Sequence, residues 1–106
     1  MQHDIRIIAL DLDGTLLNSN KELTQRSYDT LAAAAAKGIQ IVPTTGRFYD
    51  GMPQVIRELP FVNYAITING AQVRNVHTGE VLYRAEIPWQ QAVEIMTFLD
   101  TLPVVY

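Results

Sequence analysis

The sequence predicts an α/β fold, in which half of a doubly wound parallel sheet is followed by the start of an α+β unit. Short apolar runs end in polar turns at three places, and a helix-forming segment separates the first two runs. After position 71 the pattern changes to alternating apolar and polar residues, which favours an antiparallel hairpin. We therefore place the core in residues 1–71 and the second unit in residues 72–106.

Composition excludes several classes of function. The chain has 106 residues, enough for one small domain or for a domain and the start of another. Its net charge of −3 and the lack of a basic cluster argue against a nucleic-acid partner. The apolar runs are too short to cross a membrane, and no secretory pattern opens the chain. Without cysteine there is no disulfide framework. We expect a cytoplasmic protein.

The first expected strand covers residues 5–10 and ends in two aspartates, Asp11 and Asp13. Alternate residues of a strand point the same way, so both carboxylates start on one face, at the edge where open α/β sheets bind ligands. Adjacent carboxylates repel each other, and such a pair is typical of a cation site or of proton chemistry. Two alternatives remain: a polar Asp-Gly turn and a calcium loop.

A helix and a second strand are expected next. Thr24 is a suitable N-cap for a helix that runs to about Lys37, and Gly38 suits its C-terminal end. The apolar run 39–42 then predicts a second buried strand, parallel to the first. The inner face of the helix is expected to consist of Tyr28, Leu31, Ala32 and Ala35.

Polar residues follow the second strand, at the position equivalent to Asp11. A threonine hydroxyl at Thr45, backbone amides near Gly46 and the guanidinium of Arg47 suit a phosphate oxygen. The alternative is a strand-to-helix turn in which Thr45 is an N-cap. A weaker helix, interrupted by Gly51 and Pro53, is expected over residues 47–59, with Val55, Ile56 and Leu59 as its buried residues.

A third strand is expected at residues 64–68, and it ends at Asn69. Asn-Gly is usually just a tight turn, but this one falls at the same edge as the two earlier motifs. A hairpin should follow over 72–77 and 80–87. The remaining expectations are a helix that Pro88 opens, with an apolar stripe of Ala92, Ile95, Met96, Leu99 and Leu102, and a strand at 104–106.

Three motifs together resemble one family. Asp-Leu-Asp-Gly-Thr at 11–15, Thr-Thr-Gly-Arg at 44–47 and Ile-Thr-Ile-Asn-Gly-Ala at 66–71 resemble the haloacid dehalogenase-like (HAD) phosphohydrolases of the Cof type. The resemblance covers the N-terminal part of such a protein. It implies that 1–71 is part of a Rossmann-like core, and that 72–106 is a hairpin and the incomplete beginning of a large inserted cap.

The resemblance also implies a function. It implies an Mg²⁺-dependent phosphatase of small, sugar-phosphate-like metabolites that works through an aspartyl-phosphate. Asp11 would be the nucleophile and Asp13 the acid and base, with Mg²⁺ held by the Asp11 carboxylate and the Asp13 backbone carbonyl. Thr45 and Gly46 would hold the phosphoryl group, and Arg47 would bind substrate or anchor its loop. Asn69 would border the substrate entrance.

Two parts of the family pattern have no counterpart here. The family uses a later lysine and a later acidic pair, and neither Lys21 nor Lys37 matches that lysine. We therefore expect an N-terminal fragment of a larger phosphatase, inactive alone. Alternatives are a HAD phosphomutase or phosphotransferase, and a non-catalytic remnant that binds metal or a partner. A signalling receiver fits less well, because its acceptor aspartate lies on a later strand. The apolar edge of residues 5–10 should favour self-association.

Overall fold

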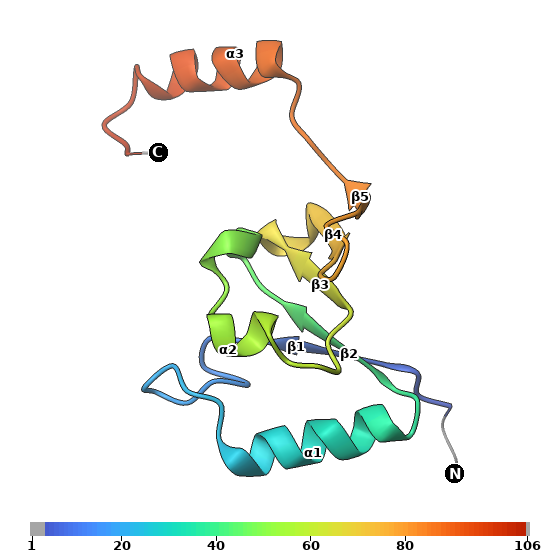
Figure 1. The fold of residues 1–106 in the computed structure, drawn as a ribbon. Coiled ribbons are helices and arrows are strands. Elements are labelled where there is room, and N and C mark those ends of the chain that lie inside the picture. Colours follow the sequence, from blue (N-terminus) through green and yellow to red (C-terminus); the bar gives the residue numbers. More distant parts are fainter. Residues whose placement is uncertain (1–3, 106) are drawn as a thin grey trace.

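The computed structural model describes residues 4–105, which form one sheet with helices beside it (Figure 1). The strands are β1 (Ile7–Asp11), β2 (Gln40–Thr44), β3 (Tyr64–Thr67), β4 (Gln72–Asn75) and β5 (Val81–Arg84). The helices are α1 (Gln25–Ala36), α2 (Gln54–Arg57) and α3 (Trp89–Leu99), with short 3₁₀ turns η1 (Tyr49–Gly51) and η2 (Ile68–Gly70).

The sheet has five strands in the order β1-β2-β3-β4-β5. β1 pairs with β2 and β2 with β3 in parallel, whereas β4 and β5 are antiparallel to their neighbours. The α/β fold and the parallel pairing of the three motif strands are thus confirmed. β1 lies at one edge of the sheet, so one side of this strand has no neighbour among residues 4–105.

Helix α1 forms as the sequence predicts. The Oγ1 atom of Thr24 accepts a hydrogen bond from the backbone N–H of Ser27 at 3.2 Å, which satisfies one of the free donors of the first turn. The helix ends at Ala36, and Gly38 follows with a φ of +88°, a conformation that suits glycine. Leu31 is the buried residue on the inner face of α1.

The hydrophobic core lies on one face of the sheet. Leu31 of α1 and Ile56 of α2 pack with Ile41 of β2 and Ala65 of β3. On the other face, an apolar pocket of about 300 Å³ opens over the strands, and its lining includes Ile7, Val42, Tyr64, Ile66, Val73 and Leu82. The residues on this face are apolar, as on a surface that is usually buried. At least one of them, Ile7, is nevertheless 61% exposed.

The expected helix over 47–59 is interrupted at Gly51 and Pro53, as the sequence predicts, and its two helical parts are short. The first part is the single turn η1, and α2 begins only after Pro53, which has no N–H to continue a helical hydrogen-bond ladder. The break changes which residues face the core. Ile56 and Leu59 are buried as expected, but Val55 is exposed and Met52 is buried in its place.

The C-terminal part confirms the hairpin and the helix. β4 and β5 form the antiparallel hairpin, and β4 also pairs with β3, so the hairpin continues the core sheet. Helix α3 starts after Pro88, has no buried residue and projects away from the sheet (Figure 1). The domain boundary at 71/72 stays a prediction.

Residues 104 and 105 are not in a strand, contrary to expectation. The backbone N–H of Val104 instead donates to the carbonyl of Leu102 in a turn at 2.9 Å, and Tyr106 lies outside the described residues. No helix within residues 4–105 is both long enough and apolar enough to span a bilayer.

Candidate functional site

The carboxyl ends of β1, β2 and β3 lie side by side and bring the predicted residues together. In the sheet register, Asp11 is opposite Thr44, and Thr44 is opposite Ile66. The chain then leaves the sheet at each of these points, toward Asp13, Thr45 and Asn69 respectively. The predicted edge therefore exists, with loops from three neighbouring strands on it.

Asp13 is the most heavily bonded side chain at this edge. Arg47 donates to it through two nitrogens, from Nε to Oδ2 at 2.9 Å and from Nη2 to Oδ1 at 2.8 Å. Lys21 donates from Nζ to Oδ1 at 3.0 Å. One carboxylate thus faces two cations, and the guanidinium holds it in the bidentate geometry that fixes orientation best.

The protonation of Asp13 follows from these partners. The hydrogen bonds from Arg47, and then those from Lys21, hold the pKa of the Asp13 carboxyl below its usual range, although desolvation acts in the opposite direction. Asp13 is therefore a carboxylate at neutral pH. In that form it can accept a proton directly, whereas it can donate one only after taking one up.

Arg47 makes the contacts of an anchor. Besides its two bonds to Asp13, its Nη1 donates to the backbone carbonyl of Gly51 at 2.9 Å. The side chain thereby ties η1 to the loop after β1. Of the two roles predicted for Arg47, the anchoring contact is present in the structure, and substrate binding stays a prediction.

Thr45 is buried, and its polar atoms are bonded to β3, to the turn after β3 and to its own loop. Its N–H donates to the carbonyl of Ile66 at 2.9 Å, and its carbonyl accepts from the N–H of Asn69 at 3.1 Å. Its hydroxyl oxygen accepts from the N–H of Arg47 at 3.1 Å, a bond of the capping type that the sequence left open as an alternative. The hydroxyl still has one hydrogen to donate.

Gly46 and Asn69 fit each other closely. A Cβ atom added at Gly46 would lie 2.8 Å from Oδ1 of Asn69, so the side chain of Asn69 occupies the space that a larger residue at 46 would need. Asn69 and the preceding Ile68 both have a φ of +52°. Asparagine tolerates this left-handed conformation, but for a β-branched residue it is strained.

Two hydrogen bonds hold that strained segment in place. The N–H of Ile68 donates to the carbonyl of Arg47 at 3.0 Å, and the N–H of Asn69 donates to the carbonyl of Thr45. The segment after β3 is thereby hydrogen-bonded to the loop after β2. The backbone at this edge of the sheet is therefore held by hydrogen bonds between the loops. Backbone strain of this kind is common at functional sites.

Asp11 differs from Asp13 in its surroundings. It is exposed, and Oδ2 accepts a hydrogen bond from the hydroxyl of Thr15 at 3.3 Å. Within residues 4–105 it forms no ion pair. Two carboxylates on one edge therefore have distinct partners, one hydroxyl for Asp11 and two cations for Asp13.

The fit to a metal ion is partial. Among the described residues, no group of three or more histidine, cysteine, aspartate or glutamate side chains is placed to hold an ion. The exposed carboxylate of Asp11 is nonetheless an oxygen donor of the type that Mg²⁺ prefers, and Mg²⁺ is often held by only one or two carboxylates plus waters and phosphate. The side chain of Asp13 is engaged by Arg47 and Lys21, which leaves its backbone carbonyl as the predicted second donor.

Sequence reasoning missed three contacts at the site, and the first is the pairing of Arg47 with Asp13. Lys21 reaches Asp13, although its position matched no motif, and Thr15 bonds Asp11. The sequence signal for Lys21 was the run of turn-forming residues 18–20 before it. In the structure these residues form a turn that brings Lys21 close to Asp13.

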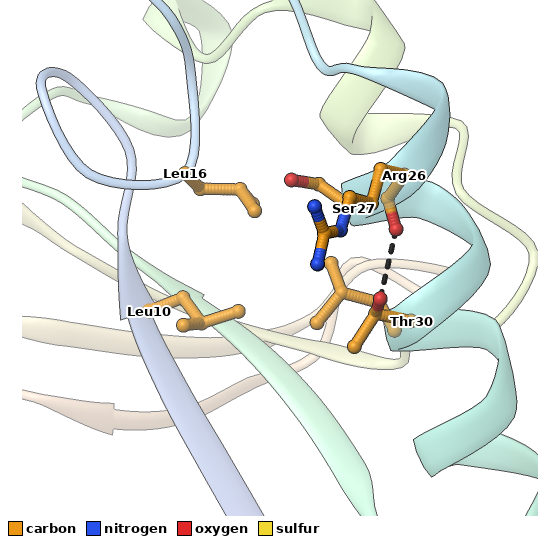
Figure 2. Close-up of a pocket in the computed structure, with 6 residues that line it drawn as sticks. Leu10, Leu16, Arg26, Ser27 and Thr30 are labelled. Atoms are coloured by element: carbon orange, nitrogen blue, oxygen red, sulfur yellow. Dashed lines mark hydrogen bonds between the residues drawn. The ribbon is translucent and has the colours of Figure 1, made fainter.

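A separate pocket of about 220 Å³ lies between β1 and the start of α1 (Figure 2). Leu10 and Leu16 face Arg26, Ser27 and Thr30 across it, and the Thr30 hydroxyl donates to the carbonyl of Arg26 at 2.8 Å. None of the predicted site residues lines this pocket. We therefore place the candidate site at the strand ends instead.

Comparison with known sequences agrees with this geometry. The sequence profile of the haloacid dehalogenase-like hydrolases matches residues 8–106. The chain belongs to this family. YxeH of Bacillus subtilis is 45% identical over 80 residues, which are 73% of this chain and 30% of YxeH. Pyridoxal phosphate phosphatase YbhA of Escherichia coli is 35% identical over 95 residues, which are 90% of this chain and 35% of YbhA.

Solved structures agree on the fold. BT1666 of Bacteroides thetaiotaomicron, described among the phosphatases of the HAD superfamily, superposes with a TM-score of 0.81 at 30% identity. The match covers 92% of this chain and 35% of BT1666. The chain spans about a third of the length of the curated relatives it matches.

Proposed function

We propose that this chain carries the nucleophile and the acid–base residue of an Mg²⁺-dependent phosphatase that acts on small phosphorylated metabolites. The observation that carries the proposal is the pair of carboxylates at the end of β1, each with different partners. Two carboxylates with different partners can take two different roles, here nucleophile and acid–base group. The HAD family membership supports the same reaction class.

In the proposed reaction, an oxygen of Asp11 attacks phosphorus and the bond from phosphorus to the ester oxygen breaks. Asp13, which is ionised at neutral pH, first takes up a proton from water and then gives it to the leaving oxygen, and the aspartyl-phosphate on Asp11 remains. Asp13, now ionised, then removes a proton from water as the water attacks phosphorus, which releases inorganic phosphate and restores Asp11. The ion pairs with Arg47 and Lys21 favour the second, basic role.

Mg²⁺, when bound, would neutralise repulsion between the Asp11 carboxylate and the phosphate. Asp11 and the backbone carbonyl of Asp13 are the residues that would hold it. The Thr45 hydroxyl, with its free hydrogen, and the backbone near Gly46 would bind the phosphoryl oxygens. Asn69, which is exposed beside Gly46, would face the substrate.

The relative YbhA is named a pyridoxal phosphate phosphatase, which supports a small phosphate ester as the substrate. The resemblance of the sequence motifs leads to the narrower proposal of a sugar-phosphate-like ester. Because the chain corresponds to about a third of its relatives, we propose that turnover also needs the later lysine, acidic pair and cap of a longer polypeptide.

The test is hydrolysis of a generic aryl phosphate with and without Mg²⁺. It is made with the longest natural polypeptide that contains these residues, and with a chimera in which they replace the matching part of YbhA. Asp11→Asn is the matched variant, since it keeps the shape of the side chain and removes the nucleophile. We expect Mg²⁺-dependent release of phosphate that Asp11→Asn abolishes.

Transfer of the phosphoryl group to a sugar instead of water would indicate the phosphomutase alternative. No turnover in the natural polypeptide, with an intact fold by circular dichroism, would instead support the non-catalytic alternative. Turnover by the 106-residue chain alone would contradict the proposal that later segments are required.

A further inference from the structure

The loop between β1 and α1 is closed by hydrogen bonds within itself. The side chain of Asn18 accepts at Oδ1 from the N–H groups of Asn20 and Glu22, both at 2.9 Å. The N–H of Asn18 donates to the carbonyl of Glu22, and the N–H of Lys21 donates to the carbonyl of Asn18, again at 2.9 Å. These bonds fix the course of the backbone through residues 18–22.

Lys21 is the residue that this loop presents to the site. Its φ is +61°, so the backbone turns in the left-handed sense at this residue. Its Nζ lies 3.0 Å from Oδ1 of Asp13, and Nη2 of Arg47 lies 2.8 Å from the same oxygen. The two cations come from two loops, the one after β1, which also carries Asp13, and the one after β2.

The second cation does more than neutralise Asp13. The bidentate contact from Arg47 already pairs one positive charge with the one negative charge of the carboxylate. Lys21 adds a second contact at Oδ1, the oxygen that Nη2 of Arg47 also contacts. The carboxylate is thereby held by one residue of its own loop and by one residue of the loop after β2.

We propose that Lys21 is a positioning residue for Asp13: from the 18–22 loop it fixes Oδ1, so that the carboxylate keeps one orientation toward the reacting ester. This inference rests on the proposed phosphatase function. Arg47 is itself bonded to Gly51, and the side chain of Lys21, although 60% exposed, contacts Oδ1 at 3.0 Å.

The first test reads the contact without any activity. A water-soluble carbodiimide joins an amine to a carboxylate with no spacer between them, so the folded protein at low concentration should form an internal amide between Lys21 and Asp13. Peptide mass spectrometry would show it as the loss of one water and a missed tryptic cleavage at Lys21. Lys21→Met and Asp13→Asn should abolish the link, and Lys37→Met should keep it. Absence of the link in the folded wild-type protein would overturn the proposal.

The second test separates positioning from a purely structural role. It uses the longest natural polypeptide that contains these residues and a generic aryl phosphate. Lys21→Met should lower kcat by about tenfold with KM nearly unchanged, and Lys21→Arg should restore most of the loss. An unchanged kcat, or a loss expressed only in KM, would overturn the proposal.

The two tests also keep this inference separate from the proposed function. If the wild-type protein hydrolyses no phosphate ester, the phosphatase proposal fails, and the positioning role fails with it, even where the cross-link shows that the contact exists. If hydrolysis occurs and depends on Asp11, but Lys21→Met leaves kcat unchanged, only the positioning role fails.

Discussion

Arg47 holds the carboxylate of Asp13 with two nitrogens, Nε at 2.9 Å from Oδ2 and Nη2 at 2.8 Å from Oδ1, across a separation of 34 positions in the chain. This contact joins the loop after β1 to the loop after β2. It therefore links the two motifs that the proposed reaction needs, and it fixes the charge state of Asp13.

The contact predicts a pH dependence of stability. The folded-state pKa of Asp13 is lowered, so the stabilisation is fully present above the unfolded-state value of about 4 and is lost as pH falls through the lower folded-state pKa. Arg47→Met should reduce the free energy of unfolding at pH 7, and the difference from wild type should shrink at acid pH. Urea titrations of both proteins at several pH values measure this. A difference that stays constant down to the acid range would contradict it.

The fit between Gly46 and Asn69 predicts coupling between these positions. Gly46→Ala should cost about 1 kcal/mol, because the new methyl group displaces the Asn69 carboxamide. In an Asn69→Gly background, which keeps the positive φ and removes the amide, Gly46→Ala should cost almost nothing. Urea unfolding of the four proteins of this cycle gives the coupling energy. Equal costs in both backgrounds would show that the two residues do not interact.

The left-handed φ of Ile68 predicts a stabilising substitution. Ile68→Asn should raise the free energy of unfolding by about 1 kcal/mol, because asparagine adopts this conformation with less strain. Ile66→Asn is the matched control: it introduces the same side chain into β3, where it should destabilise the protein. Thermal and urea unfolding of both variants measure the effect. A loss of stability in Ile68→Asn would show that the packing of Ile68 outweighs its strain.

The edge position of β1 predicts self-association of the 106-residue chain. Ile7 is 61% exposed on a strand that has one free edge among residues 4–105, and such edges pair with other chains. Multi-angle light scattering should detect dimers or larger species, and Ile7→Lys should return the chain to a monomer. Val105→Lys, at an exposed position outside the strands, should have no effect. A wild-type chain that is monomeric at high concentration and melts cooperatively would refute this prediction.

The sequence alone was sufficient to predict the neighbouring parallel strands and the residues gathered at their ends. Apolar runs that stop at Asp11, Thr45 and Asn69 can be recognised locally, and the rule that ligands lie at the carboxyl edge needs no side-chain geometry. The parallel pairing of β1 and β2 was also predictable, because two strands joined by a helix are usually parallel.

The details that could not be predicted depend on contacts between residues far apart in the sequence, or on tertiary contacts that override a local backbone preference. The pairing of Arg47 with Asp13 is a contact between distant loops, and the reach of Lys21 depends on a turn that closes around Asn18. The left-handed φ of Ile68 opposes the preference of a β-branched residue, and two hydrogen bonds to the neighbouring loop impose it.

The strands of the sheet stand in the same order in space as in the chain. Every strand after β1 therefore meets a neighbour that the ribosome has already made, and no pairing among these five has to wait for a later segment. The two antiparallel pairings close short connections, whereas the parallel pairings of β1 with β2 and of β2 with β3 close longer crossovers and are expected to form more slowly. The edge that bears Asp11, Thr45 and Asn69 consequently depends only on β1, β2, β3 and the turn after β3, and not on β4, β5 or α3.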